Sequence, residues 1–418
     1  MVVRQRQLVQ QVWLHMELPE YTCRLCNRKP STHESSMADT IVGKNIVKLF
    51  SILSDWYPAQ TKLTLEISIY SPSDAQHCFK NYLFGAHGEE DTPRPSWNDH
   101  KHFWCQGKQV ALPEQEALLR IFSMLKPRIK RSLPKVHAVT KFVIKRQMRK
   151  RLGKATLSLL WNRLPRLEEV IYEPWRVWHA NIQELYDLEY ESLLRYYLPR
   201  DLKRLTLFQD WSAKHITALR RAAHGSAGIL TVPDDRVAMA LAKRSIGLEH
   251  LAAASLVEAS SFFRSCSPHW IWENLRYLAL TSDKLAHHDS QDDETASKMG
   301  EMLESAGRVA LKMPQLREMV LWNAQGGQAG AFIYQLKHGS SFVIWRGSWT
   351  YQIPAQVLSA WEEVSKTFTT YDLIAKPAEL IKTDVNSHAE WLALLQLPGP
   401  VVDPESLRQM RKEDALAR

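Results

Sequence analysis

The chain has 418 residues, of which 45% are hydrophobic and 24% charged, with 16 Gly and 20 Pro. This composition is typical of a globular protein and excludes a disordered or fibrous one. The formal net charge is +9. No apolar stretch reaches the ~20 residues of a membrane span, and residues 1–11 lack the apolar core of a secretory signal. The five cysteines, an odd number, fit free thiols, so we expect a cytoplasmic or nuclear protein, or one of both compartments.

Near the N-terminus, Cys23 and Cys26 have the C-x-x-C spacing of half a zinc site. A structural zinc ion needs two further thiolate or imidazole ligands. The possible partners are His33, His77, Cys78 and Cys105. Neither a second C-x-x-C nor an H-x₃₋₅-H pair accompanies the motif. We therefore expect two free thiols and no metal or other cofactor, with a zinc site at Cys23 and Cys26 as the alternative.

Further along, residues 63–70 alternate apolar and polar side chains, which predicts a β-strand, and Ser71 to Asp74 predict a turn. The Gly-, Pro- and Asp-rich residues 85–99 are typical of an exposed loop. A lone strand needs a neighbour. We expect residues 40–130 to cap the repeats that follow.

The middle of the chain repeats the pattern apolar-x-x-apolar-x-apolar, often directly after a proline-containing turn. The copies begin at Leu167, Leu202, Leu248, Leu275 and Leu316. Proline cannot donate a ladder hydrogen bond, so each copy predicts a turn followed by a short strand. The intervening residues 155–164, 181–198 and 295–313 have helical apolar spacing. The repeating unit is therefore a strand plus a helix.

This unit predicts an α/β protein in the form of an irregular leucine-rich-repeat-like solenoid, with mostly parallel strands on one face and helices on the other. The alternative is a plain α/β domain whose strands are also largely parallel. Beyond the repeats, strands at 331–336 and 342–346 and a helix at 354–368 would close the array. We expect five parts: an N-terminal segment 1–39, a cap 40–130, repeats 131–330, closing strands and helices 331–397, and a polar tail 398–418.

Positive charge is concentrated in residues 117–167, which hold fifteen basic and no acidic side chains. The densest part consists of Lys145, Arg146, Arg149, Lys150 and Arg151. Such a patch can attract nucleic acid, anionic lipid or an acidic protein, or act as a nuclear import signal. The simpler interpretation is a solvated helix face.

Tryptophan is abundant, with 15 residues, and aromatic side chains are enriched where proteins bind partners. Six of them lie at or just after expected strand ends and are our candidate partner contacts: Trp175, Trp178, Trp211, Trp322, Trp345 and Trp349. Core packing is the alternative role. No G-x-S-x-G, phosphate-binding P-loop or G-x-G-x-x-G motif follows a strand, so we expect no enzyme.

Several segments together resemble a fungal F-box-like family of unknown function with a leucine-rich-repeat-like body. They are residues 13–26, 65–74, 164–175, 202–208 and 344–349. The resemblance implies an F-box that docks a Skp-type adaptor of a cullin–RING ubiquitin ligase, and a repeat body that holds the substrate. Residues 1–11 are too short for an F-box, so the adaptor would be a partner only if an F-box lies upstream.

We therefore expect a non-catalytic protein–protein recognition scaffold, resembling the substrate-binding part of an F-box ubiquitin-ligase adaptor. The alternative is a nuclear, nucleic-acid-associated protein that uses the basic segment 117–167, with binding that weakens steeply in salt.

Overall fold

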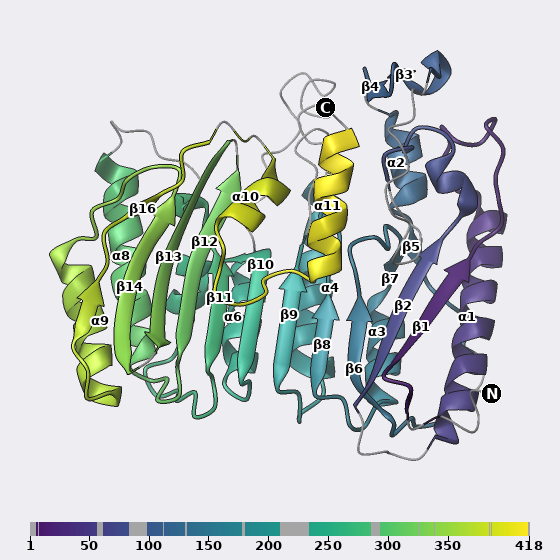
Figure 1. The fold of residues 1–418 in the computed structure, drawn as a ribbon. Helices are drawn as coiled ribbons and strands as arrows, with labels where there is room; N and C mark the ends of the chain where they lie inside the picture. The colour runs from purple at the N-terminus through teal and green to yellow at the C-terminus, as the bar shows by residue number, and fades with distance from the viewer. Residues whose placement is uncertain are drawn as a thin grey trace.

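The computed structural model describes residues 6, 8–56, 62–82, 98–111, 113–129, 132–177, 180–209, 234–285, 293–325, 327–337, 339–383, 385 and 387–416. The fold is a mixed α/β arrangement around one open, mostly parallel sheet of twelve strands. A layer of helices covers one face of this sheet, and among the described residues α10 and α11 lie on the other (Figure 1). The expected parallel α/β sheet is confirmed.

The N-terminal part forms the first strands of the sheet and a group of small elements beyond their C-terminal ends (Figure 1). Its elements are β1 (Gln11–Glu17), α1 (Thr32–Ser54), β2 (Leu63–Tyr70), η2 (Pro72–Ala75), η3 (His100–His102), β3 (Trp104–Cys105), β4 (Lys108–Gln109), α2 (Gln115–Ile121) and β5 (Met124–Leu125). The strand expected at residues 63–70 is confirmed as β2. Helix α1 starts at a capping box in which Ser31 accepts from the Glu34 N–H and Glu34 accepts from the Ser31 N–H.

The middle part alternates strands and helices, as the repeated pattern predicts. Its elements are β6 (Val139–Ile144), β7 (Arg151–Leu152), α3 (Lys154–Asn162), β8 (Glu169–Tyr172), α4 (Ala180–Ser192), η4 (Leu193–Tyr197), β9 (Arg204–Phe208), α6 (Asp235–Ser245), β10 (His250–Glu258), α7 (Ala259–Arg264), β11 (Tyr277–Thr281), η5 (Asp283–Leu285), α8 (Asp293–Ala310) and β12 (Glu318–Gln325). Strands β6, β8, β9, β10, β11 and β12 are parallel neighbours in the main sheet, in that order. Strand β7 pairs instead with β5 in a separate two-stranded sheet.

The C-terminal part supplies the last strands of the sheet, and the chain then crosses the face that is opposite the helix layer. Its elements are β13 (Gln328–Lys337), β14 (Ser340–Gly347), α9 (Ala355–Phe368), β15 (Leu373–Ala375), β16 (Glu379–Leu380), α10 (His388–Leu394) and α11 (Pro404–Leu416). The closing strands and helix are confirmed as β13, β14 and α9, with antiparallel pairing from β12 to β14.

The five repeat leucines occupy equivalent positions. Each lies two residues before its strand and is at most 6% exposed. The residue that follows each leucine donates its N–H to a backbone carbonyl of the preceding strand segment. The first of these hydrogen bonds runs from the Glu168 N–H to the Thr140 carbonyl, and the last from the Arg317 N–H to the Arg276 carbonyl. The next apolar residues, from Val170 to Met319, then pair in register across the strands. The repeat spacing thus sets the register of the sheet.

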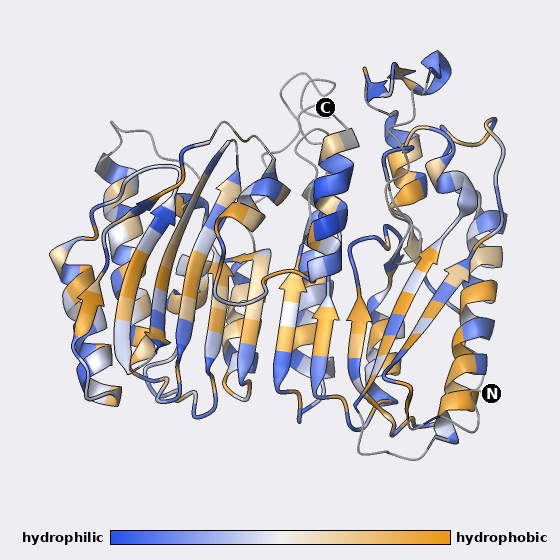
Figure 2. Cartoon of the chain, viewed as in Figure 1, coloured by the Kyte–Doolittle hydropathy of each residue, from blue (hydrophilic) through white to orange (hydrophobic). Residues whose placement is uncertain are grey.

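Successive side chains along each strand point to opposite faces of the sheet, and apolar side chains on both faces form two cores, one on each face. The larger core lies between the sheet and helices such as α1, α3, α8 and α9. The smaller core lies under α10 and α11 and includes Ala252, Ala279 and Trp391. Figure 2 shows the corresponding bands of apolar and polar residues along the strands.

The structure differs from the expected parts at three places. In the expected polar tail, the described residues include α11, which packs onto the sheet with Ser406, Met410 and Glu413 buried. The expected break between residues 39 and 40 falls inside α1, and the break between 330 and 331 falls inside β13. Residues 11–17 also join the main sheet through β1.

Among the described residues, no helix combines the length and apolarity of a membrane span.

Replacing Leu275 with alanine tests the buried equivalence of the repeat leucines. The side chain is 0% exposed, so Leu275→Ala should lower the free energy of unfolding by about 2–5 kcal/mol. The control is Leu185→Ala on α4, where the side chain is 61% exposed and the change should stay within about 0.5 kcal/mol. Urea denaturation measures both. Equal effects would contradict the assigned packing.

Candidate recognition face and thiol–imidazole cluster

The sheet face opposite the helix layer carries a row of polar and aromatic side chains, which we call the polar row. The residues pair one to the next across seven neighbouring strands and are Lys141, Glu169, Arg204, His250, Tyr277, Glu318 and Gln335. All except Tyr277 are partly exposed. Figure 2 shows polar residues at the lower ends of β8, β9 and β10, below the segment that crosses the face.

Opposite charges alternate at the start of the polar row. The Glu169 carboxylate lies 2.9 Å from Lys141 Nζ and 2.7 Å from Arg204 Nη2. Burial raises the pKa of Glu169, but the hydrogen bonds and charges of Lys141 and Arg204 outweigh it and hold the pKa below its usual value. The row therefore presents fixed charges of both signs at neutral pH.

In the middle of the polar row, the rings of His250 and Tyr277 stack with centroids 4.4 Å apart and planes 5° apart. The C-terminal segment covers Tyr277 at Gly399, where a Cβ atom would come within 2.4 Å of the tyrosine ring. Only glycine allows the backbone to approach this closely. Burial lowers the pKa of His250 to about 4, so its ring is neutral at physiological pH.

A second group of side chains extends this face onto β1 and β2; we call it the aromatic corner, and it consists of Trp13, His15, Ser68 and Tyr70. The Ser68 hydroxyl accepts from Trp13 Nε1 at 2.7 Å and lies 2.6 Å from His15 Nδ1. The rings of His15 and Tyr70 stack at 4.4 Å. These contacts hold partly exposed rings in fixed positions. None of the four was a predicted site residue, although alternation along residues 11–17 places Trp13 and His15 on one face.

The tryptophans expected to contact a partner have mostly structural positions. Trp322, Trp345 and Trp349 are 0%, 1% and 9% exposed, because they point into the two cores. Trp175 is partly buried and donates to the Arg146 carbonyl at 2.6 Å. Trp178 and Trp211 lie outside the described residues.

The densest part of the basic segment is also buried, where a charged surface was expected. Its five residues are 2–7% exposed: Lys145, Arg146, Arg149, Lys150 and Arg151. The first four lie in the loop after β6, and Arg151 is the first residue of β7, so the five do not form a helix face. Each has an acidic partner, because a buried charge is costly unless it is paired. The phosphate-binding surface that these residues would need for nucleic acid is therefore covered by protein.

The acidic partners attach the C-terminal helix to the ends of the strands. Glu413 of α11 accepts from Arg146 at 2.9 Å and from Arg149 at 2.5 Å. Both guanidinium groups also lie over the Trp175 ring, at 4.6 and 4.4 Å from its centroid. Lys145 lies between Glu66, at 3.4 Å, and Asp403, at 3.5 Å.

Glu173, the residue after β8, adds to this attachment. Its carboxylate accepts from the backbone N–H of Asp403 at 2.6 Å, from the N–H of Arg146 at 3.1 Å and from the Ser406 hydroxyl. Burial, and next the charge of Asp403, raise the pKa of Glu173 to about 7. The loop after β6, the end of β8 and α11 thus form one buried polar network.

Glu413→Gln tests whether this network holds α11. Removing the acidic charge leaves two buried guanidinium groups less well compensated, which should cost about 3–5 kcal/mol of unfolding free energy. The matched control is Glu405→Gln on the same helix, whose side chain is 41% exposed and whose ion pair should contribute at most about 1 kcal/mol. Thermal or urea unfolding measures the difference. Similar losses in both variants would argue against the network.

The lowered pKa of His250 predicts that the stability of the fold depends on pH. This pKa is about 4 in the folded chain and about 6.5 when unfolded. The unfolded state therefore binds more protons between these values, and stability present above pH 6.5 is lost as the pH falls toward 4. Relative to His250→Gln, the wild-type protein should lose stability between about pH 7 and about pH 5, as measured by urea unfolding. A difference that does not change with pH would refute the assignment.

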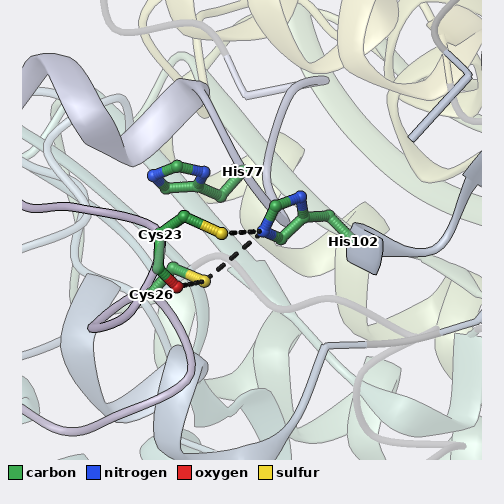
Figure 3. A group of neighbouring side chains, drawn as sticks. All are labelled: Cys23, Cys26, His77 and His102. Atoms are coloured by element: carbon green, nitrogen blue, oxygen red, sulfur yellow. Dashed lines mark hydrogen bonds between the residues drawn. The ribbon is translucent and has the colours of Figure 1, made fainter. Parts of the chain in front are cut away.

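Four potential metal ligands meet beyond the C-terminal ends of β1 and β2. We call Cys23, Cys26, His77 and His102 the thiol–imidazole cluster. Their ligand atoms all lie within 4.8 Å of one another. The cysteines lie on the turn after β1, His77 on the turn after η2, and His102 on η3. Figure 3 shows both sulfur atoms directed at the His102 ring, with His77 beside Cys23.

His102 Nε2 lies 3.2 Å from Cys23 Sγ and 3.5 Å from Cys26 Sγ. Burial, and next the neighbouring Cys23 thiol, raise the pKa of Cys26, whereas burial, and next His102, lower the pKa of His77. Protein burial thus favours the neutral forms of both residues.

Of the four partners that the sequence suggested for Cys23 and Cys26, the structure brings His77 into the group. His33, Cys78 and Cys105 are not members of it. Cys78 lies nearby and donates to the Asn27 side chain at 3.3 Å. His102 was missed because no other histidine lies at the H-x₃₋₅-H spacing from it. Local signals are Asp99, three residues before it, and Cys105, three residues after it. All five cysteines are free.

Comparison with known proteins gives a family match over part of the chain. No curated protein matches the chain. The matched region runs from the end of η4 to the residue before α11. It therefore excludes the thiol–imidazole cluster, the aromatic corner and the five buried basic residues from Lys145 to Arg151. Over residues 197–403, the chain is similar to the family described as "Family of unknown function (DUF6546)".

Proposed function

We propose that the protein is a non-catalytic recognition scaffold that holds a protein partner on the sheet face bearing the polar row and the aromatic corner. The observation that supports this most is the polar row itself. Seven strands align charged, amide and aromatic side chains in register on a face that the helix layer leaves uncovered.

The rigidity of this face favours binding. Parallel strands fix the backbone, and neighbours such as Lys141 and Arg204 hold the Glu169 side chain in place. Less conformational entropy is then lost when a partner docks. Charges of both signs provide specificity through complementarity, and Trp13 and Tyr70 supply aromatic contact area of the kind found in binding hot spots.

The proposal includes two finer interpretations. The strand-plus-helix copies stack as an irregular leucine-rich-repeat-like solenoid, for which the equivalent leucines and their register are the support. The resemblance to fungal F-box-like proteins makes the partner a substrate presented to a ubiquitin ligase in the cytoplasm or nucleus. We do not extend the proposal to nucleic acids, because the residues from Lys145 to Arg151 that would bind phosphate are buried.

Exchanging an ion pair within the polar row tests the proposal. The double variant Glu169→Arg/Arg204→Glu reverses the charge pattern and keeps the net charge unchanged. The control is the same exchange at Glu304 and Arg308, an exposed ion pair of α8 on the helix side. Tagged proteins are recovered from the cells that produce the chain naturally, and bound proteins are quantified by mass spectrometry.

We expect at least one partner to be reduced about tenfold or more by the polar-row exchange, a change of about 1.4 kcal/mol in binding, and to be retained by the α8 exchange. Circular dichroism must show that both variants are folded. Retention of every wild-type partner by the polar-row variant would refute the proposed face, and so would equal loss from the control.

A further inference from the structure

Three chain segments that are far apart in sequence converge on the thiol–imidazole cluster. His102 lies 76 residues beyond Cys26, yet its Nε2 atom is 3.5 Å from the Cys26 sulfur. A tetrahedral zinc ion has bonds of about 2.3 Å to sulfur and about 2.0–2.1 Å to nitrogen, which separates neighbouring ligand atoms by about 3.5 Å. The observed separations of 3.2 and 3.5 Å match this spacing.

The surroundings of His102 orient it as a ligand. Its Nδ1 atom lies 2.7 Å from the Asp99 carboxylate, and that carboxylate also pairs with Lys80 at 3.0 Å. An N–H donated from Nδ1 to Asp99 leaves the Nε2 lone pair free to face the two sulfur atoms. Carboxylate–histidine pairs of this kind commonly support metal-bound imidazoles.

His77 provides a second, independent observation. Its Nε2 atom is buried and has no hydrogen-bond partner among the described residues. The ring also forms a hydrogen bond with the backbone of Tyr21, which fixes its position. A buried polar atom without a partner is costly, and coordination to a metal removes that cost.

We propose that Cys23, Cys26, His77 and His102 bind one zinc ion at a structural site. Two thiolates and two imidazoles form the donor set typical of structural zinc, whereas calcium and magnesium prefer oxygen ligands. Four protein ligands fill the tetrahedron and leave no position for a substrate. The ion ties the loop after β1 to the segment that carries η3 and the β3–β4 hairpin.

The local packing gives this ion a clear role. The apolar cluster beside it is small and is formed mainly by Phe79, Tyr82, Leu118 and Ile121. Strands β3 and β4 have two residues each and form a separate two-stranded sheet. Small units with little core commonly obtain their stability from a metal.

Metal analysis of the purified full-length chain tests the site. The wild-type protein, produced with added zinc and passed through gel filtration, should carry one zinc ion per chain by elemental mass spectrometry. Cys26→Ser and His102→Gln should each lose most of it. Cys105→Ser is the matched control: it removes a nearby thiol outside the group and should retain the zinc.

Two further measurements test whether the variants lose zinc because a ligand is missing or because the chain misfolds. Titration of metal-free wild-type protein with Co²⁺ should give the absorption of a tetrahedral site with thiolate charge-transfer bands. Asp99→Asn keeps all four ligands and should weaken zinc binding about 10–100-fold in competition with a chromophoric chelator. The proposal is overturned if the wild-type protein holds no more zinc than Cys26→Ser, if Cys23 and Cys26 form a disulfide, or if Asp99→Asn binds zinc as tightly as the wild type.

Discussion

The register between neighbouring parallel strands is the constraint on which the rest of the molecule depends. It is set where a buried leucine ends each turn and the next residue donates its N–H to the carbonyl of the preceding copy. A shift of one residue would exchange the two faces of a strand. The same register therefore places leucines in the helix-covered core and aligns Lys141, Glu169 and Arg204 on the opposite face.

The C-terminal segment then determines how much of that opposite face remains accessible. It crosses Tyr277 at Gly399 and ends in α11, which is held by the buried pairs of Glu413 with Arg146 and Arg149. Buried ion pairs contribute little net stability compared with apolar packing, but they require specific partners. We infer that the network chiefly fixes where α11 docks. The polar row and the aromatic corner are the parts of the face that this segment leaves partly exposed.

Local patterns in the sequence predicted much of the fold. The spacing at Leu167 to Leu316 predicted five parallel strands, and helical periodicity located α3, α4 and α8. What the sequence could not provide was long-range pairing. The basic run lacks nearby acidic residues and so predicted a surface, whereas Arg146 pairs with Glu413, 267 residues away. Tryptophans at strand ends predicted partner contacts, but Trp322 and Trp345 point into cores whose covering elements lie elsewhere in the chain.

The distance between spin labels placed on the polar row at Lys141 and Glu318 tests the central claim most directly. Labels attached through an unnatural amino acid avoid the five native cysteines. The two positions lie five strand spacings apart in the sheet, so pulsed electron paramagnetic resonance should give about 24 Å between their backbones, since neighbouring strands lie about 4.8 Å apart. A single distance near this value supports the in-register sheet. A distance well above about 35 Å, or several distinct distances, would contradict it.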